Sequence, residues 1–243
     1  MGVQSTSERF IGGKHPIRDN LLLYLDTGNT NSYNNTGTTW TDLSGNTTHP
    51  TLENGLQIDT LDDKGPMFDF DGTDHFIDTN QKILLASATS NISIEVWFKA
   101  DSVNQLGGIV TQGITIGSFG IDRRTDGTIR MGVRGSSTAQ AVSTTTLVAN
   151  QYYCAVGTYA TTPSTKIYLN GKFEAESTTN PNLTVAGLDN QNLKIGHKNS
   201  TGGSSLSMQY FDGKVAIVRF YEKALSADEV AYNFSVDRGR FDI

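Results

Sequence analysis

The chain has 243 residues, 36% of them hydrophobic, and a formal net charge of −6 with a pI near 5.1. That length and apolar content suffice for one domain with a sizeable core. The acidic balance and the lack of a polybasic segment argue against nucleic acid and anionic membranes as partners. The first twenty residues lack the apolar stretch of a secretory signal, so we expect synthesis in a cytoplasm.

Residues 1–19 form a polar arm that offers no core face of its own. Phe10 and Ile11 are its only adjacent pair of large apolar side chains. We expect them to dock the arm on a neighbouring subunit, and the alternative is that the arm packs back on its own domain. The sequence then divides into a domain over residues 20–234 and a tail over residues 235–243.

The first strand is expected at Leu21–Leu25, an apolar run suited to burial on both faces. A turn-rich loop follows over residues 27–45, with few bulky side chains. Tyr33, Trp40 and Asp42 are its candidate binding residues. For Asp42 the competing interpretation is that the carboxylate braces a turn by accepting backbone amides.

The stretch 66–77, PMFDFDGTDHFI, predicts a hairpin around an Asp-Gly turn. Asp71 and Asp74 are candidate binding residues, and closely spaced carboxylates also suit calcium. The spacing of an EF-hand is absent, because Gly72 directly follows Asp71 and no glutamate stands at the twelfth position. Turn chemistry is the favoured interpretation, and the metal question stays open.

Strict alternation over Ile92–Lys99 predicts a half-buried strand that carries Glu95. Further strands are expected over residues 109–116, 119–123, 128–133, 152–159, 166–174 and 193–196. Asn170-Gly171 is the strongest two-residue hairpin signal in the chain. Cys154 lies in an apolar strand-like run, where a small buried thiol is expected.

The closing stretch, FDGKVAIVRFYEKALSADEV, predicts a turn at Asp212-Gly213, a core strand and a helix start. Ser226 and Glu229 have the spacing of a capping box. Leu225 and Val230 occupy the positions of a hydrophobic staple.

Five segments in order resemble the laminin G-like jelly rolls of the concanavalin A-like lectin and glucanase superfamily. They include the closing stretch, ISIEVWFK at residues 92–99 and FDFDG at residues 68–72. The stretch LLLYLDTGNTNSYNNTGTTWTDLSGN, residues 21–46, resembles a motif found before such domains in structural proteins of tailed bacteriophages. The resemblance covers about residues 21–232. It implies an all-β fold, a two-sheet antiparallel sandwich with one short C-terminal helix.

The resemblance also implies a function, that of a bacteriophage virion structural protein. We expect a capsid-decoration, fibre or tail-associated jelly roll that binds glycans and contacts other virion proteins through its arm. It would reside in the virion, as a homo-oligomer or part of a larger assembly. The alternative is a bacterial cell-surface carbohydrate-binding adhesin.

A glycoside hydrolase is the third hypothesis, and Glu95 is the residue on which it depends. Related glucanases cluster carboxylates on one strand, whereas Glu95 has no acidic companion two or three residues away. Retaining hydrolysis needs two carboxyl groups about 5 Å apart. We therefore expect no enzymatic activity and no cofactor, and leave a structural calcium ion open.

Overall fold

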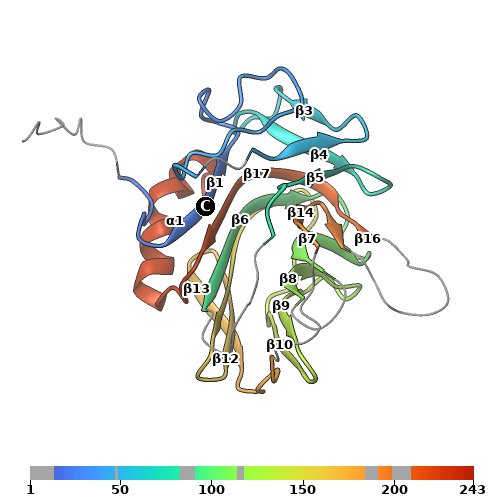
Figure 1. Cartoon of the computed structure of the whole chain (residues 1–243). Coiled ribbons are helices and arrows are strands. Elements are labelled where there is room, and N and C mark those ends of the chain that lie inside the picture. The colour runs from blue at the N-terminus through green and yellow to red at the C-terminus, as the bar shows by residue number, and fades with distance from the viewer. Residues whose placement is uncertain (1–13, 47–48, 83–90, 114–117, 184–190, 199–208) are drawn as a thin grey trace, which may run out of the picture.

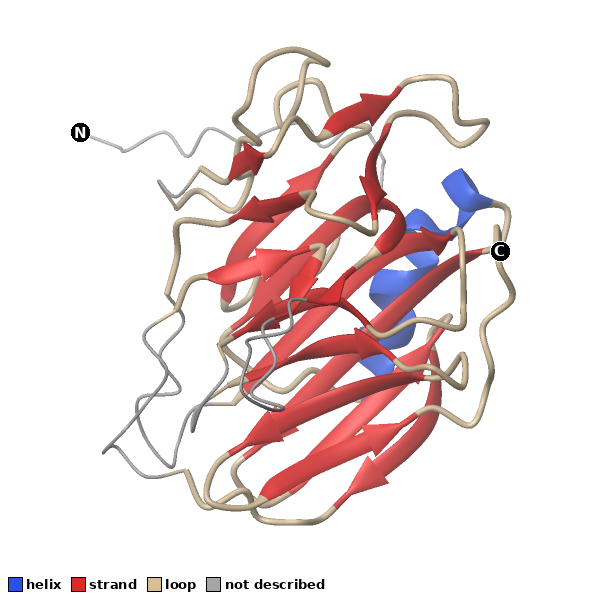
Figure 2. Ribbon diagram, turned by 90° about the vertical axis from the view of Figure 1, so that its right-hand side faces the viewer, coloured by secondary structure: helices blue, strands red, loops and turns tan. Residues whose placement is uncertain are grey.

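The computed structural model describes residues 14–46, 49–82, 91–113, 118–183, 191–198 and 209–243. Its strands form two antiparallel sheets that face each other around one core, as the all-β expectation required. Figures 1 and 2 show the sheets stacked, with the helix α1 (Ala227–Phe241) against the outer side of the larger one. No helix in the described part of the chain has the length and apolar content needed to cross a membrane.

The larger sheet has eight strands, and β17 is its central element because it pairs with three other strands. Its spatial order is β13 (Lys172–Ser177), β12 (Ser164–Leu169), β11 (Tyr152–Ala160), β6 (Ile92–Ala100), β17 (Asp212–Tyr221), β4 (Met67–Asp71) and β3 (Gln57–Asp59). The first half of β17 pairs with β4, and its second half pairs with β1 (Leu21–Asp26).

The smaller sheet has seven strands and carries the candidate site on its outer face. Its spatial order is β10 (Thr138–Val142), β9 (Ile129–Arg134), β8 (Phe119–Arg123), β7 (Gly107–Gln112), β14 (Leu193–Ile195), β5 (Phe76–Asp78) and β2 (Thr51–Glu53). A separate ladder joins β15 (His197–Lys198) to β16 (Gln209–Tyr210).

Alternation along the strands divides the apolar residues between two layers. On β6, Ile94, Val96 and Phe98 point into the core between the sheets. Trp97 points the other way, into a second apolar layer beneath α1, where it stacks on Phe241 with ring centroids 4.7 Å apart. The strand expected to be half-buried is therefore covered on both faces.

Local signals placed a hairpin turn and a helix cap correctly. Asn170 and Gly171 both have positive φ, 49° and 74°, as a two-residue hairpin between β12 and β13 requires. The capping box is present, because the Ser226 side chain accepts from the Glu229 amide and the Glu229 side chain accepts from the Ser226 amide. Cys154 is buried with a free thiol.

One predicted turn and one predicted hairpin were wrong. Asp212-Gly213 lies inside β17, where Gly213 pairs with Ala100. A Cβ on Gly213 would lie 2.3 Å from the Lys99 carbonyl oxygen, so the glycine serves a close strand approach instead of a turn. The predicted hairpin over residues 66–77 does not form either, because its strands β4 and β5 belong to different sheets.

The described residues at both ends of the chain pack against the domain. The helix occupies most of the expected tail over residues 235–243, and Phe241 is buried in the layer beneath it. In the described part of the arm, Ile17 packs on the same layer and donates its backbone N–H to Asn233 Oδ1 at 2.9 Å. This segment follows the alternative interpretation and contacts its own domain. Phe10 and Ile11 lie outside the described residues.

Candidate functional site

A groove of about 320 Å³ crosses the outer face of the smaller sheet. Strands β7, β8, β9 and β10 supply most of its surface, and β15 closes one side. Its outward-facing polar side chains include Thr111, Asp122, Arg130, Arg134, Gln140 and Lys198. These strands lie together below β14 in Figure 1, on the far side of the sandwich from α1.

Two glycines form the floor of the groove, for different reasons. Gly120 on β8 pairs with Gly132 on β9. A Cβ on Gly120 would lie 2.6 Å from Thr111 Cα and Val110 O, so the backbone itself demands glycine there. Among the described residues, the nearest contact of a Cβ on Gly132 would be Arg130 Nε, at 3.9 Å. The packing around Gly132 therefore does not require a glycine, and the missing side chain leaves a hollow in the floor.

A charged cluster stands at one end of this floor. Asp122 and Arg130 are cross-strand partners, and their side chains pair through both carboxylate oxygens, at 3.1 and 2.7 Å. Lys198 Nζ approaches the same carboxylate at 2.5 Å. Arg130 also donates from Nη1 to Oε1 of Gln140 on β10, at 3.2 Å. The bidentate pair fixes the guanidinium at this end of the groove.

Tyr33 and Trp40 lie in the core rather than in the groove. Both rings meet Phe68 edge to face, with centroids 4.9 and 4.8 Å away. Trp40 has no exposed surface and Tyr33 is 5% exposed, so neither ring offers a face to a ligand. Their role as binding residues was wrong, because the loop over residues 27–45 folds inward to cover the end of the sandwich.

Asp42 braces a turn, the competing interpretation of this residue. Its Oδ1 accepts from the backbone N–H groups of Tyr24 and Ser44, both at 2.8 Å, and Oδ2 accepts from the Ser44 hydroxyl at 2.6 Å. Asp42 is 6% exposed, and its carboxylate is committed to the loop.

Asp71 and Asp74 lie in the turn that carries the chain from one sheet to the other. Asp71 Oδ1 accepts from the backbone N–H groups of Thr73, Asp74 and His75. Burial raises the pKa of Asp71, but these amide hydrogen bonds outweigh it and lower the pKa overall. Ligand atoms of Asp71, Asp74 and His75 lie within 4.8 Å of one another. The turn explains this clustering, and calcium binding here stays an untested hypothesis.

Glu95 is buried beneath α1, in an ion-pair network that faces away from the groove. Arg219 Nη1 lies 2.5 Å from its Oε1, and neither side chain has exposed surface. Asn233 of α1 donates to its Oε2 at 2.8 Å, and Asp237 pairs with Arg219 Nη2 at 2.7 Å. Burial raises the pKa of Asp237, and the attraction of Arg219 opposes that shift. The network fastens the helix to the sheet.

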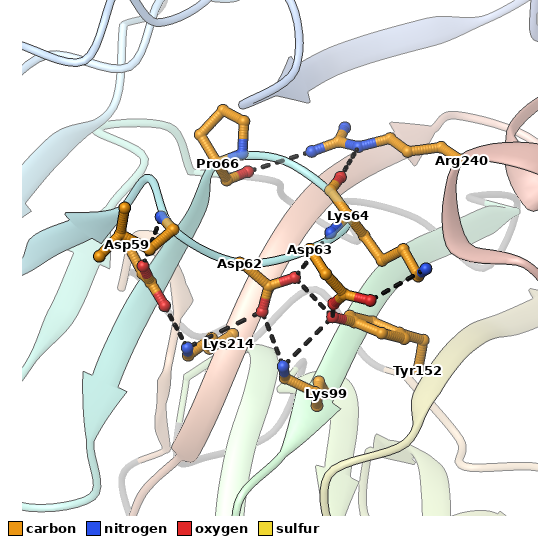
Figure 3. Close-up of polar contacts among 10 residues, drawn as sticks. Asp59, Asp62, Asp63, Lys64, Pro66, Lys99, Tyr152, Lys214 and Arg240 are labelled. Atoms are coloured by element: carbon orange, nitrogen blue, oxygen red, sulfur yellow. Dashed lines mark hydrogen bonds and ion pairs between the residues drawn. The ribbon is translucent and has the colours of Figure 1, made fainter.

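A second charged cluster, shown in Figure 3, holds the loop between β3 and β4 on the larger sheet. Asp62 accepts from Lys99 Nζ at 2.7 Å, and the Tyr152 hydroxyl lies between Asp62 and Asp63. Burial and these two carboxylates raise the pKa of Tyr152. Lys214 pairs with Asp59 in the same cluster. Because its members bind one another, this cluster restrains the loop between β3 and β4.

Sequence reasoning missed the groove residues, although one signal was present. The outward positions of β9 are Arg130, Gly132 and Arg134, so a glycine stands between two cations on the face that alternation assigns to solvent. A strand interior seldom keeps a glycine without a packing or close-approach reason. That pattern could have marked the strand.

Residues 71–231 match the laminin G-like family described as the concanavalin A-like lectin/glucanases superfamily. The chain belongs to this superfamily. The match extends over most of the domain and includes all four strands that form the groove.

Solved structures with the same fold include binding domains of botulinum neurotoxins. The serotype D binding domain aligns with a TM-score of 0.65 at 16% identity, over 90% of this chain and 51% of that one. The binding domain of neurotoxin DC, in complex with rat synaptotagmin II, aligns with a TM-score of 0.64 at 15% identity, over 90% of this chain and 52% of that one. The serotype G binding domain aligns with a TM-score of 0.63 at 11% identity, over 90% of this chain and 51% of that one. The chain thus spans about half the length of these structures. A search of the curated proteins found no match.

Proposed function

We propose that this protein is a glycan-binding module without catalytic activity, and that the groove over β7–β10 is its binding site. The observation that carries the proposal is Gly132. Its missing side chain leaves the floor open, while the described surroundings would accept a Cβ. A hollow that packing does not need, next to fixed polar side chains, is what a ligand site requires.

The chemistry of the lining supports a sugar ligand. The groove volume, about 320 Å³, is at the small end of the roughly 300–1,000 Å³ usual for ligand pockets. Arg130 and Lys198 offer donors, while Gln140 and the hydroxyl of Thr138 add side chains that hydrogen bond to ring hydroxyls. The resemblance to binding domains of known structure supports the proposal at the level of the fold alone.

A binding role fits the groove better than hydrolysis does. Asp122 is the single carboxylate among its described lining residues, and it is bound to Arg130 and Lys198. Two-carboxylate glycoside chemistry places an acid and a second carboxylate on opposite sides of the scissile bond. Incubating the protein with β-glucans and measuring reducing ends tests this part, and released ends would contradict it.

Binding is tested with a variant that fills the hollow. On a glycan array, the wild type should retain glycans that Gly132→Tyr does not. Gly239→Tyr is the matched control, because Gly239 lies on α1 and a Cβ there meets no described atom within 4 Å. An array on which the wild type binds nothing, or on which Gly132→Tyr binds as well as the wild type, would refute the proposal.

We propose further that the module belongs to a tailed-bacteriophage particle. The support is the resemblance of residues 21–46 to the motif that precedes such domains in phage structural proteins. Antibody labelling and electron microscopy of particles from a lysate that encodes this chain test the placement. Labelling of the bacterial surface without labelling of particles would favour the adhesin alternative instead.

A further inference from the structure

We infer that the ligand of the groove is an acidic saccharide, one that carries carboxylate or sulfate groups. The inference rests on the proposed glycan-binding role and adds the chemical class of the sugar. Three cations, Arg130, Arg134 and Lys198, line the groove together with one carboxylate, Asp122. In a chain with a formal net charge of −6, the groove lining concentrates the opposite sign.

The hydrogen bonds within the groove use up its strongest acceptor. Oδ1 of Asp122 accepts from Arg130 Nε, and Oδ2 accepts from both Arg130 Nη2 and Lys198 Nζ. The side-chain oxygen of Gln140 accepts from Arg130 Nη1. A neutral sugar presents hydroxyl groups that donate as well as accept, and it would find these three oxygens already engaged.

The donors, in contrast, exceed the acceptors of the cluster. A guanidinium has five N–H groups and an ammonium has three. In the described structure, Arg130 directs three of its N–H groups to Asp122 and Gln140, and Lys198 directs one to Asp122. The remaining N–H groups of both side chains are available for a ligand that only accepts. A carboxylate or a sulfate is such a ligand, and its charge strengthens each hydrogen bond.

Partial burial makes this arrangement effective. The Arg130 and Lys198 side chains are 17% and 23% exposed, so bulk salt screens them less than it screens a surface cation. Asp122 holds both cations in the groove lining and thus acts as a positioning residue. A groove with low-dielectric walls and one prevailing sign concentrates ligands of the opposite sign.

The test is a glycan array that pairs each acidic sugar with its neutral counterpart. Sialylated glycans are paired with desialylated ones, uronates with their methyl esters, and sulfated glycans with unsulfated ones. We expect the acidic member to bind at least roughly tenfold more tightly, because hydrogen bonds to charged groups are worth about one factor of ten or more. The array arms separate carboxylate from sulfate.

Lys198→Gln tests the assignment to the groove. It should weaken binding of the tightest acidic glycan by roughly tenfold and reduce its salt dependence. Lys166→Gln is the matched control, since it removes the same charge from β12 of the larger sheet. Equal thermal midpoints would show that both variants fold.

The outcomes separate the two proposals. Neutral glycans that bind as tightly as acidic ones, and that Gly132→Tyr excludes, would overturn the acidic preference and leave the glycan-binding role intact. Binding of no glycan at all would overturn both. If single-stranded DNA competes as well as the acidic sugar does, the groove is a general polyanion site and the saccharide inference is wrong.

Discussion

Replacing Glu95 by glutamine tests how the helix α1 is held on the larger sheet. The substitution removes the charge that Arg219 faces at 2.5 Å, with both side chains fully buried. It also turns an amide group toward Asn233 Nδ2, which donates to Glu95 Oε2 at 2.8 Å. Asn233 cannot rotate to compensate, because its Oδ1 accepts from the N–H of Ile17.

The expected loss follows from the geometry of the pair. Removing one partner of a buried ion pair costs about 3–5 kcal/mol of unfolding free energy. Asp237, 2.7 Å from Arg219 Nη2, leaves the guanidinium one counter-charge. We therefore expect the lower end of that range, about 3 kcal/mol. For a domain of this size, 1 kcal/mol shifts the thermal midpoint by roughly 2–4 °C, so Tm should fall by roughly 6–12 °C.

Calorimetry of Glu95→Gln beside the wild type and Glu176→Gln checks this loss of stability. Glu176→Gln is the matched control, because Glu176 is exposed on β13 and should cost less than about 0.5 kcal/mol. Retention of glycans on the array should not change in Glu95→Gln, since the groove lies on the other sheet. A midpoint within about 2 °C of the wild type would refute the reasoning, because the buried pair would then contribute less than its charges imply.

Three further predictions concern the cap, the arm and one histidine. Ser226→Ala should lower the unfolding free energy by about 1 kcal/mol, seen as a lower thermal midpoint, because the N-cap bond to the helix is lost. A chain that begins at Asp19 should melt below the full chain, because Asn233 Oδ1 loses the Ile17 amide; equal midpoints would show that this contact contributes nothing. Burial lowers the pKa of His197 from 6.5 to about 4. The unfolded chain then binds more protons between these values, so stability is full above pH ~6.5 and falls by up to roughly 3 kcal/mol as the pH drops through 4. His197→Phe should flatten that slope in denaturant melts taken across the range, and an unaltered slope would assign it to other groups.

Features set by neighbouring residues were predictable from the sequence. The Asn170-Gly171 hairpin depends on two residues that accept positive φ, and the capping box on two residues three positions apart. Alternation over Ile92–Lys99 likewise indicated a strand. Such signals need no knowledge of which strands pair.

Features that depend on strand partners were not predictable. Asp212-Gly213 has turn composition, yet Gly213 lies in β17 because β6 approaches its backbone closely. The inward fold of Trp40 depends on its meeting Phe68, which is distant in the chain. The groove requires β8, β9 and β10 side by side, and its third cation comes from Lys198, 76 positions after Asp122.

The two outer faces of the sandwich differ in how their charged side chains are placed: one face encloses them, and the other presents them in an open groove. On the helix side, Glu95 and Arg219 are fully enclosed, and their charges are satisfied by one another and by α1. Substitutions there should change stability without changing what the protein binds. On the other side, Gly132 lies on an open floor beside Arg130 and Lys198, whose hydrogen bonds in the described structure use only part of their N–H groups. Substitution of Gly132 should change binding at little expense in stability, because the nearest described contact of a Cβ there is Arg130 Nε at 3.9 Å. A single substitution that changed both stability and binding would show that strain passes from one sheet to the other. The close packing of the core between the sheets opposes such transmission.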